Sequence, residues 1–152
     1  MPSNLMRAAL YACADEPDLF AAEQELQRQA GIATGLALAQ QGWITYRFYD
    51  RGPVRHIPWK DRPRASELLS QITGPECPFG ALVLGSVRRT LPPDGYHQLL
   101  HQVIGHGLAV WLPQTEGPLD PASPIHQRLL AAALHLDHNP QAPGEGREEG
   151  RR

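Results

Sequence analysis

The charged side chains of this sequence gather in three short segments. Acidic residues follow the first apolar run, at Asp15, Glu16 and Asp18. Basic residues dominate two later segments and lie at Arg51, Arg55, Lys60, Arg62, Arg64, Arg88 and Arg89. The guanidinium fork of arginine matches the oxygens of phosphate and carboxylate groups, so these segments are candidates to bind an anion. Two plainer interpretations stay open. Carboxylates stabilise helix starts, and runs of charge often form only a solvated face.

The other residues that carry chemistry form no metal or nucleophile motif. Cys13 precedes an expected helix start, which lowers the pKa of a thiol, but Asp15 and Glu16 beside it raise that pKa. A structural cysteine is the favoured interpretation, and a reactive thiol is the alternative. His97 and His101 are four residues apart, yet no glutamate follows His97 as in the HExxH zinc motif. Glycine-rich phosphate loops and the GxSxG elbow are absent, so the sequence predicts no metal and no cofactor.

The composition predicts one folded domain. The chain has 152 residues, of which 41% are hydrophobic and 20% are charged. Its net charge of −2 and pI of about 6.4 argue against a dedicated nucleic-acid binder, whose domain pI usually exceeds about 9. We expect no membrane association, because no apolar stretch approaches the roughly 18 residues that span a bilayer. Two cysteines without a framework or a secretory signal predict a reducing, cytoplasmic setting.

The apolar periodicity predicts alternating strands and helices. Strands are expected at residues 7–12, 44–49, 80–85 and 108–112, and helices at 19–41, 62–72, 96–104 and 125–136. Gly42 is expected to end the first helix as its C′ residue, and Asp61 to cap the second. This alternation predicts an α/β fold with an open, mostly parallel sheet of four to five strands and helices on both faces. We expect one domain over residues 1–136 and a disordered tail over 137–152.

Such a sheet places its ligand site outside the carboxyl ends of its strands. The segments 13–18, 50–59 and 86–94 follow three of the expected strands, so we expect them to surround one crevice. The acidic segment and both basic segments would then face one another there.

Five stretches of the chain resemble, in order and spacing, the catalytic domain of serine recombinases of the resolvase/invertase type. They are RAALYACAD, ITYRFYDRG, DRPRASELLSQI, FGALVLGSVRRT and LAVWLPQTEGPLDPASPIHQRLL. The last stretch is especially similar to the large serine recombinases of actinobacteria. The resemblance covers about residues 6–136 and implies a resolvase-like α/β domain.

The family pattern carries over onto only part of the site. Tyr11 matches the tyrosine of the first strand, Asp50 the acidic residue after the second strand, and Arg62 and Arg89 two of the arginines. Other positions depart from the pattern. Cys13 stands where an arginine is expected, Asp15 where the nucleophilic serine is expected, Arg88 at an acidic position, and Pro92 near a further arginine. The family attacks a DNA phosphodiester with a serine hydroxyl. The resemblance therefore implies a domain that does not cleave DNA in this way.

Three functional hypotheses follow. The first is a repurposed enzyme or binder for a small anionic substrate. In it Asp15, Tyr11 and Asp50 are the candidate catalytic residues, and Arg62, Arg89, Arg88 and Arg55 the candidate anion-binding residues. The alternative is a non-catalytic accessory or regulatory protein that forms a homodimer or pairs with an intact recombinase. DNA binding is doubtful in either case, because no helix-turn-helix follows the domain. The third hypothesis is a decayed gene fragment without a role.

Overall fold

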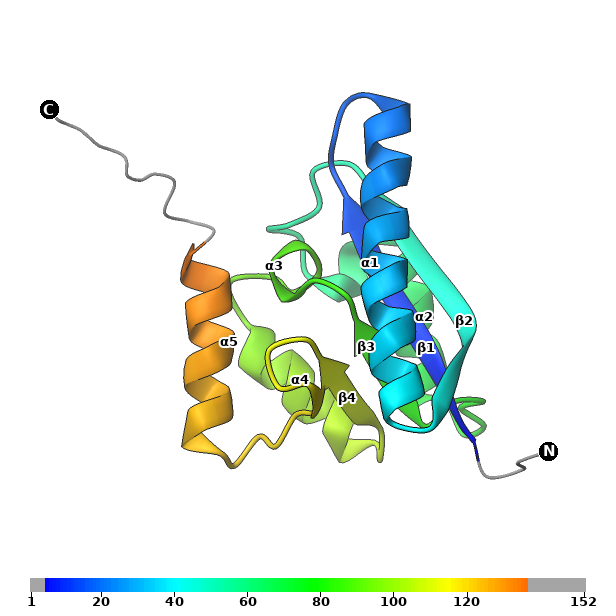
Figure 1. The fold of residues 1–152 in the computed structure, drawn as a ribbon, viewed down its shortest axis with the longest axis vertical. Helices are drawn as coiled ribbons and strands as arrows, with labels where there is room; N and C mark the ends of the chain where they lie inside the picture. The colour runs from blue at the N-terminus through cyan, green and yellow to red at the C-terminus, as the bar shows by residue number, and fades with distance from the viewer. Residues whose placement is uncertain (1–4, 137–152) are drawn as a thin grey trace, which may run out of the picture.

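The computed structural model describes residues 5–136, in which five strands form one sheet in the order β2-β1-β3-β4-β5 (Figure 1). The parallel strands are β1 (Met6–Ala14), β2 (Gly42–Arg51), β3 (Ala81–Leu84) and β4 (Ala109–Leu112). A two-residue strand, β5 (Gly117–Pro118), runs antiparallel to β4. The predicted α/β fold with an open, mostly parallel sheet is confirmed. The tail expected from residue 137 lies outside the described residues.

Helices cover both faces of the sheet, as the apolar pattern predicts (Figure 1). On one face, Ala8 and Leu10 of β1 pack against the long helix α1 (Leu19–Ala39). On the other face, Tyr11 and Cys13 belong to the larger core. That core is closed by α2 (Pro63–Thr73), α4 (Tyr96–Gly105) and α5 (Pro124–Leu136). Because successive strand residues point to opposite faces, β1 is apolar on both and lies buried at the centre of the sheet. No helix among residues 5–136 is long and apolar enough to cross a membrane.

Two segments expected as loops contain short helices. A 3-10 turn, η1 (Trp59–Asp61), lies before α2, and a single turn, α3 (Val87–Thr90), follows β3. The Ser86 hydroxyl accepts a hydrogen bond from the Arg89 backbone N–H at 3.2 Å, which caps the start of α3. The indole N–H of Trp59 donates to the Thr90 carbonyl at 2.8 Å. The loop after β2 is thereby fixed to the loop after β3.

Two expectations about helix ends are wrong. The backbone of α1 ends at Gln40, and Gln41 takes the left-handed conformation with φ 58°. Gly42 instead begins β2, where a Cβ would lie 2.7 Å from the Trp111 ring, so close packing rather than helix capping requires this glycine. Asp61 lies in η1, and the residue at the N-cap of α2 is Arg62, whose side chain makes no capping hydrogen bond.

The sheet order places a topological switch point between β1 and β3. The chain leaves β1 for β2 on one side and continues from β3 to β4 on the other. At this point the end of β3 comes very close to α1, since a Cβ on Gly85 would overlap the Gln29 carbonyl. The Gln29 side chain in turn bonds both backbone groups of Cys13, at 3.2 and 2.7 Å. The last β3 residue, Leu84, pairs with Tyr11, so β1 extends beyond β3 at Cys13. Gln29 supplies the hydrogen bonds that the backbone of Cys13 does not receive from β3.

Two alanine substitutions test this close approach. We expect Gly85→Ala to destabilise the protein by about 2–4 kcal/mol, because the new methyl group meets backbone that cannot move aside. Gly35→Ala is the matched control. Gly35 lies in α1 with nothing within 4 Å of its Cβ position, so alanine there should stabilise by up to about 1 kcal/mol. Urea unfolding of both variants measures the difference, and a Gly85→Ala variant as stable as wild type contradicts it.

Candidate functional site

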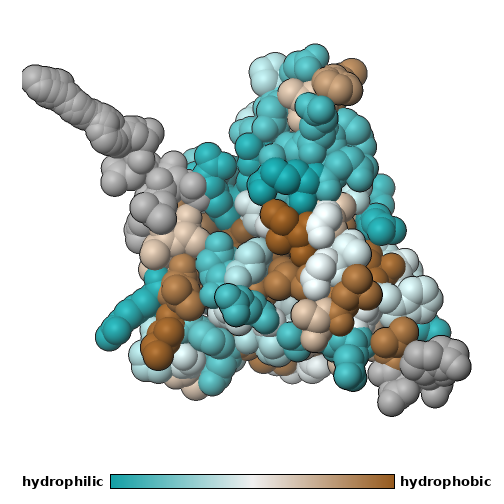
Figure 2. Space-filling view, viewed as in Figure 1, coloured by the Kyte–Doolittle hydropathy of each residue, from teal (hydrophilic) through white to brown (hydrophobic). Residues whose placement is uncertain are grey.

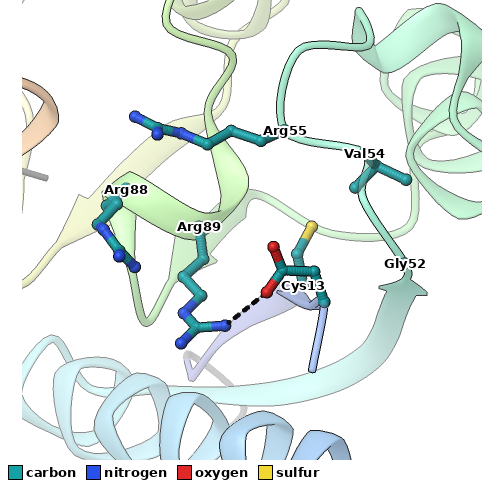
Figure 3. Close-up of a pocket in the computed structure, with 7 residues that line it drawn as sticks. Cys13, Gly52, Val54, Arg55, Arg88 and Arg89 are labelled. Atoms are coloured by element: carbon teal, nitrogen blue, oxygen red, sulfur yellow. Dashed lines mark hydrogen bonds and ion pairs between the residues drawn. The ribbon is translucent and has the colours of Figure 1, made fainter. Parts of the chain in front are cut away.

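A small cavity of about 160 Å³ lies at the carboxyl ends of β1 and β2, beside α3 (Figure 3). We call it the arginine cavity. It is lined by Cys13, Asp15, Gly52, Val54, Arg55, Arg88 and Arg89. Residues from all three predicted loop segments meet here, which places the cavity at the switch point where open α/β sheets bind ligands. Five of the eight candidate residues named from the sequence line it directly, namely Cys13, Asp15, Arg55, Arg88 and Arg89.

Three carboxylates surround the Arg89 guanidinium. Its nitrogens lie 3.4 Å from Asp15, 3.0 Å from Glu16 and 3.4 Å from Glu25. The hydrogen bond from Arg89 lowers the pKa of the Glu16 carboxyl, and the bond from Arg28 is the main cause of the lowered pKa of Glu25. Both carboxylates therefore stay ionised at neutral pH and offset the charge of Arg89. Asp15 is the most open of the three, with 61% of its side chain exposed.

Arg55 stands in a different electrostatic environment. Its Nε and Nη2 atoms are buried and have no hydrogen-bond partner among residues 5–136. Figure 3 shows its side chain extending along the same side of the cavity as Arg88 and Arg89, with the Cys13 thiol facing them. A buried donor without a partner is costly, because its lost hydration is not replaced. The wall of the cavity thus holds two guanidinium donors that the described residues do not satisfy.

A buried polar network lies behind the cavity and contains two of the proposed catalytic residues. The Tyr11 hydroxyl donates to Asp50 Oδ2 at 2.7 Å. The two Asp50 oxygens also accept from the backbone N–H groups of Arg64 at 2.8 Å and Ala65 at 3.0 Å. These are first-turn donors of α2, so Asp50 caps that helix from the neighbouring strand. Tyr11 is fully buried and Asp50 is 2% exposed, which removes both from the cavity surface.

Arg62 belongs to the same network and is also fully buried. Its guanidinium donates to the Tyr11 hydroxyl at 3.2 Å and to the backbone carbonyls of Thr90, Ile57 and Arg55 at 2.7, 2.8 and 3.1 Å. Asp15 and Arg89 line the arginine cavity, but Arg62, like Asp50, lies behind it. Its donors point to the backbone, and they hold the loop after β2 and the end of α3 around the cavity.

Burial keeps the Tyr11 hydroxyl and the Cys13 thiol protonated. It raises the pKa of Tyr11 well above the usual range, and it raises the pKa of Cys13 to about 11 in spite of Arg62 3.6 Å from the sulfur. A protonated thiol is a poor nucleophile. Cys13 therefore contributes a small, uncharged side chain to the lining of the cavity. Among the described residues, no group of three or more histidine, cysteine or acidic side chains is arranged to hold a metal ion.

Two further residues support the site, and the sequence-based reasoning missed the first of them. Gln29 is fully buried on α1 and fixes the end of β1, and Trp59 is 2% exposed and packs edge-on against Tyr11 with ring centroids 4.7 Å apart. A glutamine on the alanine-rich face of α1 was the available signal for Gln29, because that face packs on the sheet.

Comparison with known proteins supports the fold by structure alone. No protein-family model and no curated protein matches the sequence. The N-terminal catalytic domain of TP901-1 integrase superposes with a TM-score of 0.62 at 14% identity, covering 87% of this chain and 94% of that one. The C-terminal catalytic domain of ISC1926 TnpA, an IS607-like serine recombinase, gives 0.59 at 13% identity, with 88% and 100% covered. The fold is that of serine recombinase catalytic domains, as the sequence resemblance implies.

The role assigned to Asp50 predicts the effect of removing its carboxylate. Asp50→Ala leaves two buried donors and one partly buried donor without an acceptor, and we expect it to destabilise the protein by about 3–5 kcal/mol. Asp50→Asn keeps one acceptor oxygen and should cost about half as much. Urea unfolding of the two variants provides the test. An Asp50→Ala variant within about 0.5 kcal/mol of wild type would show that the network does not support the fold.

The raised pKa of Cys13 predicts slow alkylation. In a Cys77→Ser variant, we expect Cys13 to react with iodoacetamide at pH 8 at least tenfold more slowly than the half-buried Cys77 does in a Cys13→Ser variant, because little thiolate is present. The free thiol ionises near pH 9 and the folded one near 11. Unfolding therefore releases a proton between these values, and the stability that Cys13 contributes falls as the pH rises through them. Rapid alkylation of Cys13 at pH 8 contradicts this.

Proposed function

We propose that this chain is a serine-recombinase-type catalytic domain that does not perform serine chemistry on DNA and instead binds a small anion in the arginine cavity. The observation that carries the proposal is Arg55, whose two unpartnered guanidinium nitrogens are buried at the wall of that cavity. A bound oxyanion would accept hydrogen bonds from both nitrogens and would neutralise the charge. Arg88 and Arg89 line the same cavity, and the charge of Arg89 is offset by the three carboxylates around it.

The side chains around the cavity argue against the family reaction. At the position where the resemblance expects the nucleophilic serine, Asp15 has no hydroxyl, and its carboxylate lies 3.4 Å from Arg89. Burial keeps the Cys13 thiol and the Tyr11 hydroxyl protonated, as the raised pKa values of both groups indicate. The hydroxyl of Ser86, on the neighbouring loop, caps α3. None of these groups is activated to attack a phosphodiester.

The rim of the cavity favours a small anion over DNA. Asp15 lines the cavity, Asp18 and Glu23 follow it in the loop and first turns of α1, and the chain as a whole carries a net charge of −2. A polyanion that spans many phosphates would meet this acidic rim, whereas a single oxyanion needs only the cavity. If the bound anion reacts, the exposed carboxylate of Asp15 is the lining group placed to move a proton.

One surface favours the second candidate function, pairing with an intact recombinase. Figure 2 shows hydrophobic surface over α5. On this helix Ile125 is 65% exposed and Leu129 is 38% exposed, one helical turn apart. Exposed apolar residues at this spacing are typical of a helix face that meets a partner. We rank this candidate second, because two side chains are a small part of the roughly 800 Å² per partner in a stable interface.

Anion binding is tested with inorganic phosphate and one substitution. We expect phosphate to raise the melting temperature of the wild-type protein in a dose-dependent way, since a ligand of the folded state stabilises it. Arg55→Met should lose most of this response. In the absence of phosphate the variant should be at least as stable as wild type, because two buried donors without a partner have been removed.

Arg51→Met is the matched control, because Arg51 pairs with Glu23 outside the cavity and is half exposed. It should respond to phosphate as wild type does. Equal responses of the Arg55 and Arg51 variants, or no response of the wild type, would contradict the proposal. Nicking of supercoiled DNA by the wild-type protein, with a covalent protein–DNA adduct, would show instead that the protein performs the family reaction.

A further inference from the structure

A second recess adjoins the arginine cavity on the other side of α3. This groove has a volume of about 480 Å³ and lies between α1, α3, the end of β4 and α5. We call it the α5 groove. Arg88 and Arg89 line both recesses, so the two adjoin at these side chains. Because β1, β3 and β4 all end here, both recesses lie at the carboxyl edge of the sheet.

The α5 groove contains a buried acceptor without a donor. Gln114 follows β4, and its Oε1 atom is buried and makes no hydrogen bond within the described chain. A buried carbonyl left without a donor costs about 1–3 kcal/mol, so an N–H or O–H group of a ligand would be favoured there. The rest of the lining is mixed, with the apolar side chains of Ile32, Val87 and Ala133 beside Arg28. A ligand with a flat apolar surface and polar groups at its edges suits such a lining.

The volumes of the two recesses indicate what each can hold. Sites for small organic molecules measure roughly 300–1,000 Å³. The arginine cavity, at about 160 Å³, holds little more than one oxyanion, whereas the α5 groove, at about 480 Å³, has room for a heterocycle or a sugar. Arg55, with unpartnered donors, lines the cavity, and Gln114, with an unpartnered acceptor, lines the groove. We call the two recesses together the composite site.

We propose that the arginine cavity and the α5 groove together bind a mononucleotide-like phosphomonoester. The phosphate occupies the arginine cavity against Arg55, and the nucleoside crosses Arg88 and Arg89 into the α5 groove. There a base or ribose donor bonds Gln114 Oε1, and guanidinium planes along the groove offer stacking surfaces for the base. This inference rests on the proposed function of the arginine cavity, and it adds the class of molecule that carries the anion.

Calorimetric titration tests the composite site with inorganic phosphate, the four ribonucleoside monophosphates and the corresponding nucleosides as probes. We expect at least one nucleotide to bind the wild-type protein about tenfold or more tightly than phosphate, which corresponds to about 1.4 kcal/mol. Gln114→Leu should remove most of this gain and leave the affinity for phosphate within about twofold of wild type, since only the groove is altered. Arg55→Met should weaken the binding of both phosphate and the nucleotide.

Gln71→Leu is the matched control, because Gln71 also has a buried, unpartnered Oε1 but lies on α2, away from the groove. It should bind each nucleotide as wild type does. If phosphate binds through Arg55 but no nucleotide binds more tightly, or if Gln114→Leu keeps the full gain, the composite site is overturned and the proposed anion site stands. If neither phosphate nor any nucleotide binds, the proposed function itself fails.

Discussion

The buried carboxylate of Asp50 joins three parts of the molecule that form the candidate site. It accepts the Tyr11 hydroxyl from the central strand and two backbone N–H groups from the start of α2. Arg62 extends the same network from Tyr11 to the Thr90 carbonyl at the end of α3. Because a buried charge is stable only when its hydrogen bonds are satisfied, strand, helix and loop must keep these relative positions. The walls of the arginine cavity are the outer surfaces of the same segments.

The charged side chains of this network and of the cavity differ in how completely they are paired. Asp50 and Arg62 are satisfied by backbone groups and by Tyr11, and Arg89 is matched by three carboxylates. Arg55 is left with buried donors and no partner among the described residues. Structural ion pairs and polar networks in folded proteins are normally satisfied. Because Arg55 also lines a cavity at the switch point of the sheet, where this class of fold binds ligands, we base the proposed anion site on it.

The sequence was sufficient to predict the architecture, because the apolar runs of β1 and β3 and the helical spacing in α2 follow simple periodicities. The sequence also predicted that Asp15, Arg55, Arg88 and Arg89 lie at one edge of the sheet, because the carboxyl ends of parallel strands share that edge. It could not show that Asp50 and Arg62 are buried, because polar residues beside loops are usually exposed. The capping of α2 by Asp50 and the bonding of Cys13 by Gln29 depend on contacts between segments distant in sequence. β5, with two residues, carries no periodicity.

The account depends most directly on where an oxyanion binds. A crystal structure of the protein with selenate, whose anomalous scattering identifies it, measures this without reference to activity. The account predicts an anomalous peak in the arginine cavity within hydrogen-bond distance of the Arg55 Nε and Nη2 atoms, with Tyr11, Asp50 and Arg62 unchanged behind it. An empty cavity, with the Arg55 guanidinium paired instead to a carboxylate of the protein, would contradict it.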